Sequence, residues 1–240
     1  MTDDLKAVYH LFNPDKALFD EDLKKYYVEI GENEVRISKL RTRLELGLET
    51  GEAIKILFTG HRGSGKSTAL NRLVSNLSDD FFVVSYDILE LLDSNDVNYA
   101  DVLFSILARL IERTGEEKIE IGKALIERAN KWGSSITKEI ISSETDEVGA
   151  GLGVGFPRFI ELFARMKNET ETREEVRKEI RPRISELISI INDMVIDIEK
   201  TGKQVLIIID NLEKSDPVKA FDLFGNHGTQ LAQPKCKIIY

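Results

Sequence analysis

A phosphate-binding loop is the clearest chemical motif in this sequence. Residues 60–68 read GHRGSGKST, which matches the pattern G-x-x-x-x-G-K-[ST] at every fixed position. Its glycines let backbone N–H groups approach an anion, and the N-terminus of a following helix favours negative charge. Lys66 is expected to reach the β- and γ-phosphates of ATP, and the Ser67 hydroxyl to ligate Mg²⁺. The predicted nucleotide-binding residues are Gly60, Arg62, Gly63, Ser64, Gly65, Lys66, Ser67 and Thr68.

A second acidic motif lies about 140 residues later. Residues 205–209 form the apolar run VLIII, which predicts a buried strand, and Asp210 follows it directly. A buried strand delivers such a carboxylate to the edge of an α/β sheet where ligands bind. Asp210 is therefore the second predicted Mg²⁺ ligand, and Glu213 is predicted to orient or deprotonate the attacking water. Lys66, Asp210 and Glu213 are the predicted catalytic residues.

Strands and helices alternate around these two motifs, which predicts an α/β fold with a parallel sheet. Short strands are expected at 54–59, 81–86, 204–209 and 237–240. The strand at 54–59 is predicted to be buried. Amphipathic helices are expected at 17–27, 34–49, 67–76, 97–113, 116–132, 156–178, 182–200 and 217–232, the last with a break at Gly225.

The section between the second strand and the Asp210 strand is much longer than one crossover helix requires. We therefore expect a large helical insertion on a P-loop NTPase core. The predicted organisation is an N-terminal helical extension (1–33), the first part of the core (34–115), the insertion (116–200) and the rest of the core (201–240). The glycine-rich stretch at 149–155 lacks the Gly-Lys-Ser of a phosphate loop and is expected to be a loop or hairpin.

With both motifs in place, the chain resembles the additional-strand P-loop ATPases of the AAA+/STAND kind, in particular archaeal-type and origin-recognition-like ATPases. The resemblance rests on the helix at 34–49, GHRGSGKST, Asp87 after the second strand, and IIIDNLEK at 207–214. It implies that a strand at 237–240 lies between the loop strand and the Asp210 strand. In such families a sensor residue and an arginine finger come later than Tyr240, so a truncated catalytic site is expected.

Composition limits the partners and the cellular location that can be expected for the protein. The 240 residues carry 33 basic and 42 acidic side chains, a net charge of −9, which argues against a surface devoted to nucleic acid. Neither a signal peptide nor an apolar run of membrane-spanning length is evident, and one cysteine excludes an internal disulfide. A cytoplasmic location is expected.

Several other residues have a functional and a structural interpretation. His61 could sense the γ-phosphate or fill a permissive position, and Arg62 could touch phosphate, contact a neighbouring subunit or be exposed. Arginines and lysines between 173 and 183 alternate with glutamates at helical spacing, which favours an intrahelical ion-pair face over a nucleic-acid grip. Trp132 and the phenylalanines at 156, 159 and 163 are predicted to form the core of the insertion.

The favoured function is an ATPase that acts as a nucleotide-controlled regulatory or assembly switch, through self-association or an appended effector. This fragment could also bind ATP without efficient turnover. The first alternative is a DNA-loading or remodelling ATPase of origin-recognition type. The second is a small-molecule kinase, which would not need so large an insertion. A GTPase is disfavoured because its N-K-x-D motif is missing: Asn130-Lys131 continues with Trp132-Gly133.

Overall fold

A four-stranded parallel sheet forms the centre of the computed structural model, which describes residues 17–28, 31–61, 63–77, 79–91, 96–140, 156–168, 170–212 and 217–240. Its strand order is β1–β4–β3–β2. The strands are β1 (Lys55–Ile56), β2 (Phe81–Asp87), β3 (Gln204–Asp210) and β4 (Lys237–Ile239). The parallel α/β class is confirmed. The strand near 237–240 also lies where the resemblance placed it, between the loop strand and the Asp210 strand.

β3 is buried on both faces of the sheet. Leu206 and Ile208 contact the helices on one face, and the alternate residues Val205, Ile207 and Ile209 contact those on the other. Each of the five side chains is at most 1% exposed. A strand with two covered faces requires a continuous apolar sequence, which explains the run that made this strand recognisable.

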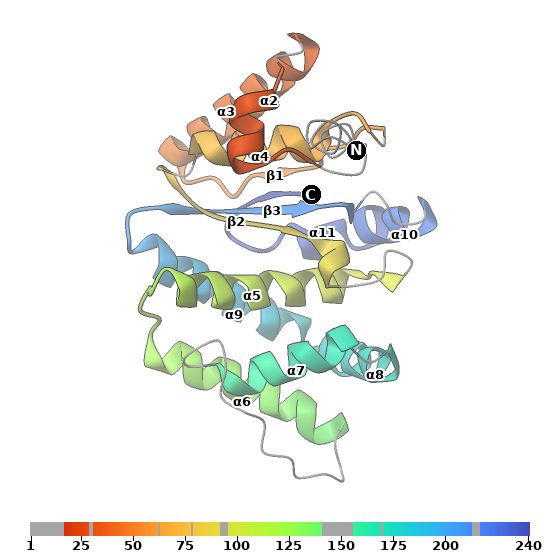
Figure 1. Cartoon of the computed structure of the whole chain (residues 1–240). Helices are drawn as coiled ribbons and strands as arrows, with labels where there is room; N and C mark the ends of the chain where they lie inside the picture. Colours follow the sequence, from red (N-terminus) through yellow and green to blue (C-terminus); the bar gives the residue numbers. More distant parts are fainter. Residues whose placement is uncertain are drawn as a thin grey trace, which may run out of the picture.

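Helices lie in layers above and below the sheet (Figure 1). On one face are α3 (Gly31–Thr50) and α4 (Lys66–Leu77), with α2 (Asp20–Tyr26) beside them. The other face is covered by α5 (Tyr99–Glu116) and α9 (Ile184–Glu199). A further layer beneath them contains α6 (Lys123–Ile140), α7 (Pro157–Asn168) and α8 (Thr170–Ile180). The shorter elements are η1 (Ile88–Glu90), η3 (Arg181–Arg183), α10 (Pro217–Phe221), the π-helical turn η5 (Asp222–Asn226) and α11 (Gly228–Leu231).

Helix limits differ from the sequence prediction mainly where turns interrupt a charged run. The segment 156–178 is divided into α7 and α8, and the helix expected at 116–132 begins at Lys123 instead. Gly225 lies in η5, so the break expected there is present as a π-helical turn. The glycine-rich stretch at 149–155 lies outside the described residues.

β1 differs from the buried strand predicted at 54–59. Its pairing with β4 extends from the Ile54 carbonyl, which accepts from Ile238 N at 2.9 Å, to Phe58 N, which donates to Tyr240 O at 2.8 Å. Ile54 is 3% exposed, but Leu57 is 54% exposed. Within the described residues β1 is an edge strand, so only part of the segment is buried.

The layer of α6, α7 and α8 shares one hydrophobic cluster with α5, α9 and the lower face of the sheet. Trp132 on α6 and Phe159 on α7 are 3% and 0% exposed, and both rings lie against Phe104 of α5. Phe156 is 2% exposed, and the partly buried Phe163 also lies against Phe104. The burial predicted for these aromatic residues is confirmed, in a cluster that they share with α5 and the sheet.

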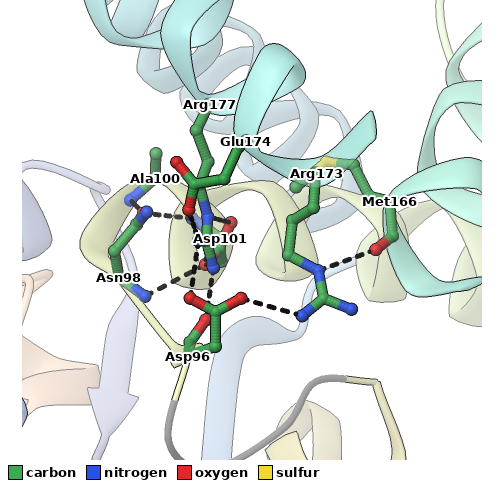
Figure 2. Close-up of polar contacts among 8 residues, drawn as sticks. All are labelled: Asp96, Asn98, Ala100, Asp101, Met166, Arg173, Glu174 and Arg177. Carbon is green, nitrogen blue, oxygen red and sulfur yellow. Dashed lines mark hydrogen bonds and ion pairs between the residues drawn. The ribbon is translucent and has the colours of Figure 1, made fainter. Parts of the chain in front are cut away.

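A buried ion cluster joins α8 to the N-terminus of α5 (Figure 2). Arg177 Nε lies 3.0 Å from each carboxylate oxygen of Asp101, and its Nη1 lies 2.8 Å from Asp96 Oδ1. Arg173 donates to Asp96 Oδ2 at 3.1 Å and to the Met166 carbonyl at 2.9 Å. The intrahelical ion pairs predicted for the basic run therefore describe these two arginines incompletely, because both are buried, at 6% and 2% exposed, against carboxylates of another segment. Arg177 also makes an intrahelical ion pair with Glu174, as the sequence predicted.

Asp101 also belongs to the cap of α5. Asn98 Oδ1 accepts from the N–H groups of Ala100 and Asp101 at 2.9 and 3.2 Å, and Asp101 Oδ2 accepts from Asn98 N at 3.0 Å. This reciprocal arrangement satisfies N–H groups that a helix start leaves without intrahelical partners. The ion cluster is thus built on the segment that leads from β2 into α5.

Candidate nucleotide-binding site

The phosphate loop connects the end of β1 to the first residue of α4. Gly63 and Gly65 have φ angles of +77° and +81°, in the left-handed region that favours glycine. At Gly60 an added Cβ would lie 3.1 Å from Ser64 Oγ, so a side chain there would crowd the loop. The spacing of the glycines therefore matches the turn that the backbone makes, and the loop leads directly into the N-terminus of a 12-residue helix.

Lys66 lies over this loop. Its Nζ donates to the carbonyl oxygens of Gly60 at 3.0 Å and His61 at 3.2 Å. The ammonium group is thus held beside the loop backbone, at the N-terminal end of α4. Positive charge and helix dipole together favour an anion at this position. His61 is an exposed loop residue, and Arg62 lies outside the described residues.

The first turn of α4 also anchors the N-terminal segment. Thr68 Oγ1 accepts from Leu18 N at 3.1 Å, and Asn71 Nδ2 donates to the Leu18 carbonyl at 2.9 Å. Thr68, predicted as a nucleotide contact, therefore has a structural partner. Leu18 and Asn71 were not predicted to interact, since nothing in their sequence separation of 53 residues indicates it.

The acidic edge of the site is formed by two neighbouring strands. β2 and β3 run parallel in a register that pairs Asp87 with Asp210 at their carboxyl ends. Asp210 Oδ1 accepts from Asn211 N at 2.8 Å, and the Asn211 amide donates to Asp87 Oδ2. The other oxygen of Asp87 accepts from Leu89 N at 2.8 Å. Asp87 was noted in the sequence only as the acidic end of its strand.

Ser67 and Asp210 are suitable ligands for magnesium. Ser67 is the second residue of α4, and Asp210 ends a central strand of the same parallel sheet. Among the described residues there is no group of three or more His, Cys, Asp or Glu side chains that could hold a metal ion. Mg²⁺ usually takes one or two protein oxygens together with water and substrate phosphates, and Ser67 and Asp210 could supply two such oxygens. Glu213 lies outside the described residues, so its predicted role remains a prediction.

Comparison with protein families gave a match to the model described as the KAP family P-loop domain, over residues 39–225. The match begins in α3, contains both nucleotide motifs and the helices between them, and ends in η5. No curated protein and no solved structure matched the chain. In the part of the chain that the structure describes, no helix is both long and apolar enough to cross a bilayer.

Proposed function

Since the chain belongs to the KAP family of P-loop NTPase domains, we propose that it binds ATP with Mg²⁺, hydrolyses it, and uses the nucleotide state as a regulatory or assembly switch. Nucleotide binding is the property that the family assigns. The choice of ATP, the metal, turnover and the switch are our proposals. The observation that supports them best is the β1–loop–α4 unit, with Lys66 beside a loop of left-handed glycines.

The geometry of the loop supports the proposed roles of its residues, and the role of Glu213 rests on the sequence. Backbone N–H groups of the loop and the α4 N-terminus bind the triphosphate, and Lys66 neutralises charge on the β- and γ-phosphates. Ser67 and Asp210 would hold the magnesium ion, which would stabilise the charge that develops on the phosphates. Glu213, three residues after Asp210, orients the attacking water and accepts its proton.

The switch proposal is supported by how the helical layers are attached. Asp87 is tied to the Asp210 edge through Asn211, and the chain that follows Asp87 reaches Asp96 and Asp101 in the ion cluster. α8 is therefore bonded to the segment that leaves the nucleotide edge. A conformational change at the Asp210 edge could therefore be passed along this short segment of chain to α8. A switch needs such a physical connection between the nucleotide site and the element that responds.

The nucleic-acid alternative is less well supported. Arg173 and Arg177, the two arginines of the basic run that are most buried, already pair with Asp96 and Asp101. They do not contribute to a basic surface that could contact phosphate groups of DNA. Together with the net charge of −9, this favours the switch.

The test is the binding of fluorescent ATP and GTP analogues, with and without Mg²⁺, to the wild type and to Lys66→Ala. We expect tight ATP binding, and a loss of at least about 100-fold in Lys66→Ala, since the ammonium is a main phosphate contact. Lys39→Ala is the matched control, because this exposed lysine lies on α3 and should leave binding unchanged.

Light scattering after ATP addition, and phosphate release, then test assembly and turnover. The central proposal fails if the wild type does not bind ATP or if Lys66→Ala binds it equally well. Equal affinity for GTP would contradict the assignment to ATP. Salt-sensitive binding to duplex DNA would favour the loading alternative.

A further inference from the structure

The carboxylate of Asp87 lies beside the predicted magnesium ligand but is not itself part of either nucleotide motif. Asp87 and Asp210 are paired in the β2–β3 register, and both strands end at these residues. Cα atoms of neighbouring strands are about 5 Å apart. Two carboxylates at this spacing repel each other unless donors hold them, and three donors are present.

The three donors form a continuous chain of hydrogen bonds. Leu89 N–H donates to Asp87 Oδ1 at 2.8 Å, and the Asn211 side-chain amide donates to Asp87 Oδ2. The backbone N–H of the same Asn211 donates to Asp210 Oδ1 at 2.8 Å. One residue thus holds both carboxylates, with its side chain on one and its backbone on the other.

Asn211 needs this support because its backbone is unusual. Its φ angle is +67°, which costs a non-glycine residue about 1–2 kcal/mol, although Asn tolerates it better than most. Its side chain is 8% exposed, so its amide requires a partner. Asp87 supplies an ionised acceptor, which makes a stronger bond than a neutral one.

We propose that Asp87 is a positioning residue for Asp210. Acting through Asn211, it fixes the turn at the end of β3 so that one oxygen of Asp210 is occupied by the Asn211 N–H and the other is directed to the Mg²⁺ ion of the nucleotide complex. This inference rests on the proposed function, because it presumes that Asp210 holds the ion. It assigns Asp87 and Asn211 to the support of the metal site, a role that neither motif indicates.

The experiment measures metal binding apart from turnover. The affinity for a fluorescent ATP analogue is measured with EDTA and with Mg²⁺, and Mn²⁺ bound in the ATP complex is measured by electron paramagnetic resonance. In Asp87→Asn we expect unchanged affinity in EDTA and a loss of metal affinity of about 10–100-fold, as is typical when a residue that orients a metal ligand is removed. An asparagine has one acceptor oxygen where Asp87 has two, so it cannot accept from both Leu89 N–H and the Asn211 amide, and the bond that it keeps has lost its charge.

The exchange Asp87→Asn with Asn211→Asp is the decisive variant. It restores a donor and an acceptor at this contact, with the charge moved from the end of β2 to the residue after β3, and we expect it to recover most of the lost metal affinity. Asn211→Gly is the second variant. Glycine adopts the left-handed backbone without strain and keeps the backbone N–H, but it lacks the side-chain amide that binds Asp87. This variant should therefore lose metal affinity as Asp87→Asn does.

The outcomes separate this inference from the proposed function. If the wild type binds no ATP, or if Asp210→Asn has no effect on metal affinity, the proposed function fails. If the wild type and Asp210→Asn behave as expected but Asp87→Asn and Asn211→Gly bind Mn²⁺ like the wild type, the positioning role is wrong. A folded Asp87→Asn that loses metal affinity but is not rescued by the exchange also overturns it, because the carboxylate would then act at its own position.

Discussion

Replacing Arg177 with methionine should destabilise the protein more than any surface charge substitution. The Arg177 and Asp101 side chains are 3% and 0% exposed, and they are joined through Nε and Nη2 of the guanidinium. The variant leaves the Asp101 carboxylate buried without its cation. Removing one partner of a buried ion pair typically costs about 3–5 kcal/mol, because the remaining charge has neither water nor a counter-ion. At roughly 2–4 °C per kcal/mol for a chain of this size, the expected fall in Tm is about 6–20 °C.

Trp132 is a natural probe for this measurement. It is the single tryptophan of the chain, it is 3% exposed, and it lies against Phe104 and Phe159 in the helical layers next to the ion cluster. Urea unfolding followed by its fluorescence gives the free energy of unfolding.

Arg128→Met and a double variant serve as controls for this measurement. Arg128 pairs with Asp193, but the two side chains are 47% and 42% exposed, so the loss should be below about 1 kcal/mol. The double variant Arg177→Met with Asp101→Asn removes both charges and should be more stable than Arg177→Met alone.

The destabilisation should also depend on pH. Burial raises the pKa of Asp101, while the hydrogen bonds and charge of Arg177 lower it and so limit the rise. Without Arg177 the pKa should rise further above the unfolded value, so the folded state binds a proton more strongly than the unfolded chain. Stability of the variant relative to wild type should therefore recover as pH falls from about 8 to about 5. A difference that does not change with pH, or that is no larger than for Arg128→Met, would refute this account of the cluster.

Two further predictions concern a glycine of α3 and the buried cysteine. Gly47→Ala should lower the free energy of unfolding, measured in urea, by about 1–3 kcal/mol, because the new Cβ would lie 2.4 Å from Ile54 Cδ1 and 2.8 Å from Lys237 Cε. Gly115→Ala in α5 is the control: its Cβ would meet nothing within 4 Å, so it should be neutral or stabilising. Equal effects of the two substitutions would contradict the packing argument. Burial raises the pKa of Cys236 to about 12, so the native thiol should stay unreactive toward a disulfide reagent up to about pH 9 and react only on unfolding. Rapid reaction of the folded protein would show that the site opens.

The sequence was most informative where local pattern and burial coincide. The apolar run of β3 and the glycines of the phosphate loop could be identified because a doubly covered strand and a left-handed turn each restrict residue type directly. The position of β4 between β1 and β3 followed from the resemblance and is confirmed by the pairing of Ile238 with Lys55 on one side and Ile207 on the other. β1 was less predictable, since its sequence does not indicate that Leu57 would lie exposed at the edge of the described sheet.

Contacts between distant segments could not be predicted from periodicity. The basic residues of α8 have glutamates at helical spacing, which is sufficient to explain them as local ion pairs. Arg177 instead pairs with Asp101, 76 residues earlier, and burial of both side chains is what gives the pair its importance. Asn211 is similar, because its bond to Asp87 depends on the β2–β3 register, and a register of one residue more or less would separate them.

These two unpredicted contacts lie at opposite ends of one stretch of chain. The stretch begins with Asp87, beside Asp210. It ends with Asp96 and Asp101, which form ion pairs with arginines of α8. Helices α6, α7 and α8 share a hydrophobic cluster with the sheet, so apolar packing as well as the ion cluster connects them to it. A displacement of Asp87 must then either be absorbed between it and Asp96 or move the N-terminus of α5 together with α8. Arg177→Met distinguishes these cases, because it should uncouple nucleotide-dependent hydrogen exchange in α8 from that at the end of β2 only if the displacement is transmitted.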